Sequence, residues 1–316
     1  MHKHDIDIFL ITYNRVNKLE ATLDRLLAED SPIKNYEIKI QDNASTDDTE
    51  RYCRTVMKKH PNIVYTRNKI NIGPSGNAIK AMESAAKKWL WILCDDDGYD
   101  WSHWYEIDTA LSSGGYDIVH TTYTKERNET YPYIINEEGF LPTSIYNTKH
   151  VTPLTMHNAY GIAYTLFPQL AIGCKVINEK GSIFVPKGKV VLQGTSDKYN
   201  FVRIQSQGLF HRFANYQVLA GMIAAYQLIE DPEIRRTCYD ILCLGNDFKY
   251  SMGCFLEWNK GYINNIADIL IAIDIEQKKT FFEAMSEAVP EKSKSFTDFI
   301  REIYPLVLAA EAKITE

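Results

Sequence analysis

The sequence predicts an α/β protein with a mostly parallel sheet flanked by helices, and three observations support this prediction. Short apolar runs recur through the N-terminal third of the chain, and stretches with apolar residues three or four apart separate them. This alternation of strand and helix signals is typical of parallel strands joined by right-handed crossovers. Polar and acidic residues directly follow the strand-like runs, at the edge where such sheets bind ligands.

The first predicted strand covers residues 6–12 and ends at Tyr13 and Asn14. Its run of apolar and β-branched residues is typical of a strand buried on both faces. A helix is predicted directly afterwards, because apolar residues then recur at steps of three and four and form one stripe. The residues of that stripe are Val16, Leu19, Leu23, Leu26 and Leu27.

The second predicted strand, residues 36–41, alternates apolar and polar residues and leads to Asp42 and Asn43. Ser45 and Asp48 then have the spacing of a capping box, which predicts that a helix begins there. This second unit therefore repeats the order of the first, with polar residues between strand and helix.

The third predicted strand covers residues 63–66, and a turn over residues 71–77 follows it. Gly73 and Pro74 in that turn suit the start of a helix. The fourth predicted strand is the apolar run 89–94.

Three consecutive carboxylates, Asp95, Asp96 and Asp97, follow the fourth strand. Three charges cannot share a core without partners, so they are expected to emerge into a polar crevice. Mg²⁺ or Mn²⁺ prefers hard oxygen ligands and is often held by one or two carboxylates together with substrate phosphates. The sequence therefore predicts a site for a nucleotide diphosphate at the carboxyl ends of the strands.

Composition narrows the classes of protein. The chain has 316 residues, 45% of them hydrophobic and 24% charged, which is typical of a globular protein. A formal net charge of −6 argues against a nucleic-acid partner. The N-terminus lacks the apolar run of a signal peptide, and no stretch of about 18 apolar residues predicts a transmembrane segment. Together with cysteines spaced unlike a zinc ribbon, these features predict a cytoplasmic protein.

Four motifs follow one another along the N-terminal hundred residues: Ile11-Thr12-Tyr13-Asn14-Arg15, the segment from Asp42 to Asp47, Asn71-Ile72-Gly73 with Asn77, and Asp95-Asp96-Asp97. In this order and at these intervals they resemble the family 2 inverting glycosyltransferases, which have the glycosyltransferase A fold. No single motif suffices, because acidic strand ends are common. The resemblance is specific over residues 6–100 and fades beyond about residue 120.

The resemblance implies roles in binding a UDP-sugar donor. Thr12 and Asn14 would border the nucleotide, and Asp42 would accept the imide hydrogen of uracil in a charge-assisted bond. A turn-capping role for Asp42 stays open beside it. The donor-binding residues implied are Thr12, Tyr13, Asn14, Asp42, Asn71, Gly73, Asn77, Asp95 and Asp96.

The resemblance also implies a Mn²⁺ or Mg²⁺ cofactor. Asp97 would bind the metal that bridges the two phosphates, and Asp95 would contact either the ribose or the metal. His211 would complete the metal shell, although a structural histidine is an open alternative. Gly98 follows where the family often has another acidic or polar residue, so the register of the motif stays open.

An inverting transfer needs a base that takes the proton of the acceptor hydroxyl. The resemblance implies Asp197 for this role, in the segment Gly194-Thr195-Ser196-Asp197, where Ser196 replaces the Glu usual in the family. A helix N-cap at Ser196 or Asp197 is the alternative, and the two roles are compatible.

The implied enzyme is a metal-dependent hexosyl- or N-acetylhexosaminyltransferase that acts on a glycan or lipid-linked saccharide in bacterial surface polysaccharide synthesis. A nucleotidyltransferase and a non-catalytic nucleotide-sugar-binding module are the alternatives. Residues 1–215 would form the catalytic domain, and residues 216–316 a helical C-terminal appendage, because apolar stripes recur there. Peripheral association with the inner face of the membrane stays open.

Overall fold

The computed structural model describes residues 4–122, 131–132, 135, 139–163, 167–192, 194, 222 and 224–244. The chain divides into two compact units, Met1–Lys198 and Tyr199–Glu316. In the second unit, helix α11 (Pro232–Leu244) follows Asp231, whose Oδ1 accepts the backbone N–H groups of Glu233 and Ile234. The predicted domain boundary at residue 215 lies outside the described residues and stays a prediction.

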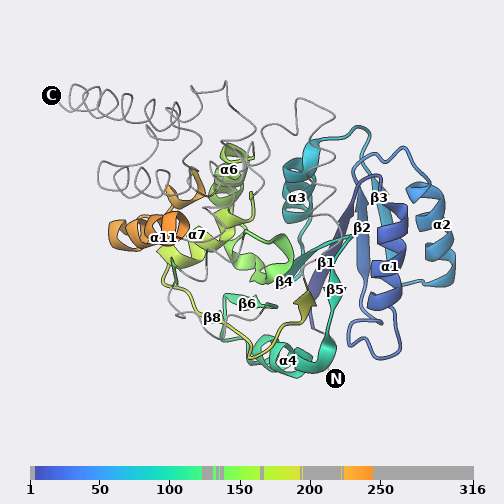
Figure 1. Ribbon diagram of the computed structural model, residues 1–316, viewed down its shortest axis with the longest axis horizontal. Coiled ribbons are helices and arrows are strands. Elements are labelled where there is room, and N and C mark those ends of the chain that lie inside the picture. The colour runs from blue at the N-terminus through green and yellow to red at the C-terminus, as the bar shows by residue number, and fades with distance from the viewer. Residues whose placement is uncertain are drawn as a thin grey trace, which may run out of the picture. The chain divides into compact units, whose positions relative to one another are not determined.

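A seven-stranded sheet with the order β3-β2-β1-β4-β7-β6-β8 forms the centre of the first unit (Figure 1). Its first four strands run parallel, as predicted: β1 (Ile6–Thr12), β2 (Ile38–Asp42), β3 (Ile63–Arg67) and β4 (Trp89–Cys94).

The other half of the sheet contains antiparallel pairs. Strand β7 (Ser144–Asn147) pairs antiparallel with β4, and β6 (Ile118–His120) pairs antiparallel with β7. Strand β8 (Ile183–Phe184) closes this edge in parallel with β6. The short elements around it are η2 (Leu141–Thr143) and η3 (Thr148–His150).

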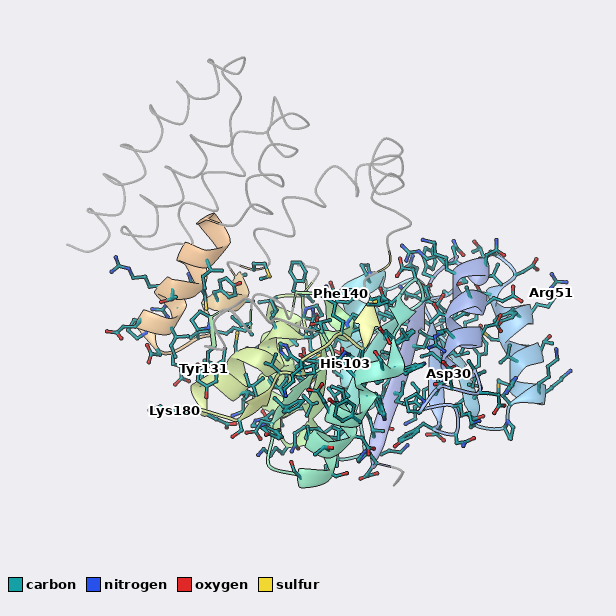
Figure 2. The ribbon with its side chains drawn as sticks, turned by 60° about the horizontal axis from the view of Figure 1, so that its bottom comes forward. Asp30, Arg51, His103, Tyr131, Phe140 and Lys180 are labelled. Atoms are coloured by element: carbon teal, nitrogen blue, oxygen red, sulfur yellow. The ribbon has the colours of Figure 1, made fainter. Side chains whose placement is uncertain are left out.

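Helices cover both faces of the sheet, and Figure 2 shows their side chains. On one face, α1 (Val16–Leu26), α2 (Thr49–Lys59) and α4 (Trp104–Ser113) share a hydrophobic core with alternate residues of the strands, such as Ile8 and Leu10. On the other face, α3 (Gly73–Glu83) packs on β1 and β4, and α6 (Pro153–Gly161) contacts both α3 and α7 (Leu170–Asn178). No helix among the described residues is long and apolar enough to cross a membrane.

The capping box predicted at Ser45 and Asp48 is wrong. Helix α2 begins at Thr49, and the side chain of its N-cap residue, Asp48, makes no capping hydrogen bond. Ser45 Oγ instead donates to Asp42 Oδ1 at 2.6 Å. A hydrogen bond to a buried carboxylate is charge-assisted, so it is stronger than a neutral cap.

A small second sheet holds a distant loop beside the carboxylate run. Strand β5 (Gly98–Tyr99) pairs antiparallel with β9 (Val191–Leu192), so Gly98 lies opposite Leu192. The short helix η1 (Trp101–His103) follows β5, and Trp101 stacks on Tyr99 with ring centres 5.2 Å apart. The pairing of β5 with β9 brings the chain around residue 194 to the end of β4.

Candidate active site

The carboxyl ends of β1, β2 and β4 meet at one edge of the sheet. Thr12 lies opposite Asp42 in the register of β1 and β2, and the backbone N–H of Asn43 donates to the Thr12 carbonyl oxygen at 2.9 Å. Thr12 Oγ1 donates to Asp95 Oδ2 at 2.6 Å. The structure thus brings together the polar strand ends that the sequence placed at one edge.

Two of the carboxylates share a cation from the start of α1. Arg15 Nη1 donates to Asp95 Oδ1 at 3.1 Å and to Asp96 Oδ2 at 3.0 Å. Lys18 Nζ lies 3.8 Å from Asp96. Burial raises the pKa of Asp95, although Arg15 and the Thr12 hydroxyl act against that shift. Sequence reasoning assigned Arg15 no role, and the available signal was a cation directly after the polar end of the first strand.

The third carboxylate differs from its neighbours. The Asp97 residue is only 6% exposed, and its Oδ1 accepts the backbone N–H of Gly194 at 3.0 Å. Its Oδ2 is buried and has no hydrogen-bond partner among the described residues. Burial, reinforced by Asp96 and Asp95, raises the pKa of Asp97 to about 7. A buried acceptor without a partner carries a desolvation cost of about 1–3 kcal/mol, more for a charged group.

The donor set fits a hard divalent cation. Asp95 and Asp97 offer carboxylate oxygens, and among the described residues Asp97 Oδ2 has no hydrogen-bond partner that would compete with a cation. Within the part of the chain that is described, no group of three or more His, Cys, Asp or Glu side chains is arranged for a metal. Mg²⁺ and Mn²⁺ need no such group, because substrate phosphates and water can complete the coordination of a site with one or two carboxylates.

Asp42 is fully buried, and protein groups engage both of its oxygens. Oδ1 accepts the backbone N–H of Ser45 at 2.8 Å as well as its hydroxyl, and Oδ2 accepts the Tyr65 hydroxyl at 2.7 Å. These contacts are those of the turn-capping alternative. The uracil contact of Asp42 stays a prediction.

Asn14 joins the loops that follow β1 and β2. Its φ of 53° lies in the left-handed region, and its Oδ1 accepts the Thr46 backbone N–H at 2.6 Å. Its own N–H donates to Ser45 Oγ at 2.9 Å. Tyr13 beside it is 40% exposed, so its ring is available to a ligand at this edge.

The loop before α3 is built on amide side chains. Asn71 Oδ1 accepts from Asn43 Nδ2 and from the Gly73 N–H, each at 2.8 Å.

The side chain of Asn77, near the start of α3, is buried. Its Oδ1 accepts from Gln41 Nε2 at 2.9 Å and from Nδ2 of Asn68, the residue after β3, at 3.0 Å. Asn77 therefore fixes the start of α3 to the sheet, and its contact with the donor stays a prediction.

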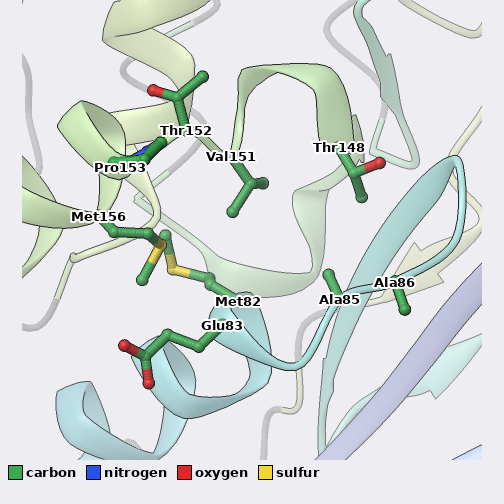
Figure 3. A pocket seen from close by; sticks show the side chains of 9 residues that line it. All are labelled: Met82, Glu83, Ala85, Ala86, Thr148, Val151, Thr152, Pro153 and Met156. Carbon is green, nitrogen blue, oxygen red and sulfur yellow. The ribbon is translucent and has the colours of Figure 1, made fainter.

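The structure has a cavity elsewhere. A hollow of about 440 Å³ lies between the end of α3 and the start of α6 (Figure 3). Helix α3 runs from Gly73, near the carboxyl ends of the strands, back to Glu83, so this hollow lies at the opposite edge of the sheet. It is lined by Met82, Glu83, Ala85, Ala86, Thr148, Val151, Thr152, Pro153 and Met156.

The predicted base Asp197 and the predicted metal ligand His211 lie outside the described residues.

The known proteins that this sequence matches are glycosyltransferases. The family described as "Glycosyl transferase family 2" matches residues 7–180. Abequosyltransferase RfbV of Salmonella typhimurium is 24% identical over 314 residues, which cover 83% of this chain and 92% of RfbV. An uncharacterized glycosyltransferase of Rickettsia felis is 27% identical over 172 residues, which cover 54% of this chain and 27% of that protein.

Solved structures share the fold. The crystal structure of S. aureus TarS 1–349 superposes with a TM-score of 0.57 at 16% identity, over 98% of this chain and 91% of that one. The mannosyltransferase PcManGT from Pyrobaculum calidifontis, in complex with GDP-Man and Mn²⁺, superposes with a TM-score of 0.56 at 14% identity, over 98% and 87% of the two chains. The mostly parallel sheet described above is the glycosyltransferase A fold of these proteins.

Proposed function

Because this chain belongs to glycosyltransferase family 2, we propose that it is a metal-dependent inverting glycosyltransferase that uses a UDP-sugar donor. The observation that supports the metal is the buried Oδ2 of Asp97, which has no partner among the described residues. An oxygen in that state, beside a second buried carboxylate at the ligand-binding edge, is suited to a hard cation.

Asp97 and Asp95 would hold Mn²⁺ or Mg²⁺. When bound, the cation would supply Lewis-acid stabilisation of the negative charge that develops on the departing diphosphate. Arg15, which already pairs with Asp95 and Asp96, keeps positive charge at the same edge. Asp197 would take the proton of the acceptor hydroxyl, on the side opposite the departing nucleotide.

A structural neighbour supports a UDP-sugar as the donor. TarS 1–349 has been solved with UDP-GlcNAc, and that structure superposes on this chain with a TM-score of 0.52. Tyr13 and the loop of Asn71 and Gly73 would border the nucleotide, and Asp42 the uracil. RfbV is an abequosyltransferase, so a relative that aligns along most of this chain also transfers a sugar. For this chain we propose a saccharide acceptor, either a glycan or a lipid-linked saccharide. We place the reaction in the cytoplasm, in bacterial surface polysaccharide synthesis.

A donor screen tests the proposal. Purified protein is incubated with UDP-sugars, and with GDP-, CDP- and dTDP-sugars for comparison, in Mn²⁺ or in excess chelator, and the release of nucleotide is measured. We expect metal-dependent release of UDP from one UDP-sugar. In a parallel assay with UTP and sugar 1-phosphates in place of the nucleotide-sugars, release of inorganic diphosphate would instead indicate a nucleotidyltransferase. Binding of a UDP-sugar without turnover would indicate a nucleotide-sugar-binding module. Turnover in excess chelator would contradict the metal dependence.

The stereochemistry and the base are tested with the acceptor in place. NMR of the product should show that the anomeric configuration of the donor is inverted. Asp197→Asn should bind the donor normally and lose about 10²–10⁴-fold in transfer rate, the usual range for general base catalysis. A retained configuration would overturn the inverting mechanism, and near-normal transfer by the variant would assign the base to another residue.

A further inference from the structure

Gly194 approaches the backbone of the carboxylate run more closely than any residue with a side chain could. A Cβ built on Gly194 would lie 2.1 Å from the carbonyl oxygen of Asp96 and 3.1 Å from its carbonyl carbon. Both contacts are with backbone, which cannot rotate away as the end of a side chain can. The close approach therefore requires glycine at position 194.

The close approach gives Asp97 a hydrogen bond to one of its two carboxylate oxygens. The N–H of Gly194 donates to Oδ1 of Asp97 at 3.0 Å, and Oδ2 has no partner among the described residues. A carboxylate held by one oxygen has a restricted rotation, so the direction of its second oxygen is fixed. The hydrogen bond from Gly194 thus fixes Oδ1 of Asp97 and leaves Oδ2 available to a ligand.

Contacts on the N-terminal side of Gly194 fix the loop that carries it. The Lys187 N–H donates to Glu106 Oε2 at 2.9 Å, and Glu106 Oε1 lies 3.1 Å from Nδ1 of His103 (labelled in Figure 2). Gly188 packs on the same ring, since a Cβ there would lie 2.1 Å from a ring carbon of His103. The Asp100 N–H donates to the Val190 carbonyl oxygen at 2.9 Å. The start of α4 and strand β5 therefore hold this loop in place.

We propose that Gly194 is a positioning residue of the metal site: its backbone N–H holds Asp97 Oδ1 so that Oδ2 faces the cation. The proposal rests on the proposed function, because it presupposes that Asp97 is a metal ligand. Under this proposal the metal site requires, besides its carboxylates, a glycine from a loop that is distant in sequence.

Gly194→Ala tests this role, with Gly98→Ala as the matched control. Gly98 lies next to Asp97, but a Cβ there would be 3.5 Å from its nearest neighbour, Leu192, which is ordinary contact. Binding of Mn²⁺ is measured by the loss of the free-ion signal in electron paramagnetic resonance, with and without UDP. We expect Gly194→Ala to weaken Mn²⁺ binding by about 10- to 100-fold, the usual effect of losing a partner that orients a ligand. Gly98→Ala should bind like the wild type.

Hydrogen exchange tests the same contact without altering Gly194. Asp97→Ala removes the acceptor, so the amide of residue 194 should exchange at least about tenfold faster, as expected when a local hydrogen bond is lost. Asp100→Ala, which changes a neighbouring exposed carboxylate that caps η1, should leave that amide unchanged. This measurement decides the matter even if Gly194→Ala does not fold.

The outcomes separate the inference from the proposed function. If the wild type binds Mn²⁺ and Asp97→Asn does not, the metal site stands. Wild-type affinity in folded Gly194→Ala, or unchanged exchange at residue 194 in Asp97→Ala, would then overturn the positioning role alone. If the wild type does not bind Mn²⁺ even with UDP, the metal site itself is wrong, and the positioning role falls with it.

Discussion

Asp97 and Asp117 are both buried aspartates of the first unit, but their hydrogen-bond partners differ and their pKa values are shifted in opposite directions. Asp97 has one hydrogen bond and one oxygen without a partner among the described residues, and its pKa is raised to about 7. Asp117 accepts from His150 Nε2 at 3.0 Å and from the Ser182 N–H at 2.9 Å, and it pairs with Lys149. Although burial acts to raise the pKa of Asp117, these hydrogen bonds outweigh it and lower the pKa to about 2.

The difference distinguishes a carboxylate that stabilises the fold, Asp117, from one that is suited to bind a ligand, Asp97. Asp7, at the amino end of β1, follows the Asp117 pattern: Lys39 Nζ lies 2.6 Å away, and the Ala86 and Lys87 N–H groups donate to its other oxygen. The described residues satisfy these structural carboxylates but not Oδ2 of Asp97, which leaves a free-energy cost at the ligand-binding edge. A strongly raised pKa in such a place is a mark of a functional site.

The largest expected effect concerns Asp97. Asp97→Asn keeps an oxygen that can accept the Gly194 N–H but removes the charge, so donor turnover should fall by at least about 10²-fold, in line with several kcal/mol of lost metal stabilisation. Asp117→Asn serves as the control and should keep normal turnover per folded molecule. Initial rates of UDP release measure both. Unchanged turnover in Asp97→Asn would remove the distinction between the two carboxylates.

The next expected effect is on stability, and here the substitution of Asp117 should have the larger effect and that of Asp97 the smaller. Asp117→Asn should lower the free energy of unfolding by about 1.5–3 kcal/mol, because hydrogen bonds to charged groups contribute that much. Asp97→Asn should cause no comparable loss. Urea denaturation at pH 7 without metal measures both variants. Equal stability of Asp117→Asn and the wild type would mean that its charge has no structural role.

The pH dependence of stability sharpens the same point. The carboxyl of Asp117 has a pKa of about 2 in the folded state and an ordinary value of 3.8, so the unfolded chain binds the proton first as pH falls. Its contribution to stability is present above about pH 4 and is lost as the pH falls toward 2. The gap in melting temperature between wild type and Asp117→Asn should therefore close over this range. A constant gap would contradict the paired state of Asp117.

The smallest expected effect concerns Asp42, which combines features of both carboxylates. It is fully bonded like Asp117 but lies at the ligand-binding edge like Asp97. If it also contacts uracil, Asp42→Ala should raise KM for the UDP-sugar about tenfold with less change in kcat, because that contact is far from the reacting carbon. Steady-state kinetics and melting temperature are measured together. Lower stability at unchanged KM would make Asp42 purely structural.

The parallel half of the fold could be predicted from sequence because its strands are long, apolar and followed by polar residues. Predicted ranges 6–12 and 89–94 coincide with β1 and β4. The antiparallel half could not be predicted. Strands such as Ile118–His120 are too short to carry a period, and their pairing depends on contacts with segments distant in sequence.

The site shows the same limit. Three adjacent carboxylates after an apolar strand predict an acidic crevice, but nothing in Asp95-Asp96-Asp97 says which oxygen stays without a partner. That depends on Arg15, which engages Asp95 and Asp96, and on a backbone N–H of Gly194. The direction of a backbone N–H is a property of the folded loop, so the sequence shows a glycine without showing what it donates to.

Anomalous diffraction at the manganese edge, from crystals grown with Mn²⁺ and UDP, tests the central claim most directly. The account predicts an anomalous peak about 2–2.5 Å from Asp97 Oδ2, within the range of oxygen ligands to divalent cations. It also predicts that the Gly194 N–H still holds Oδ1 in that complex. UDP bound at this edge with no peak at Asp97 would contradict the account, because the unpartnered oxygen would then serve some purpose other than holding a cation.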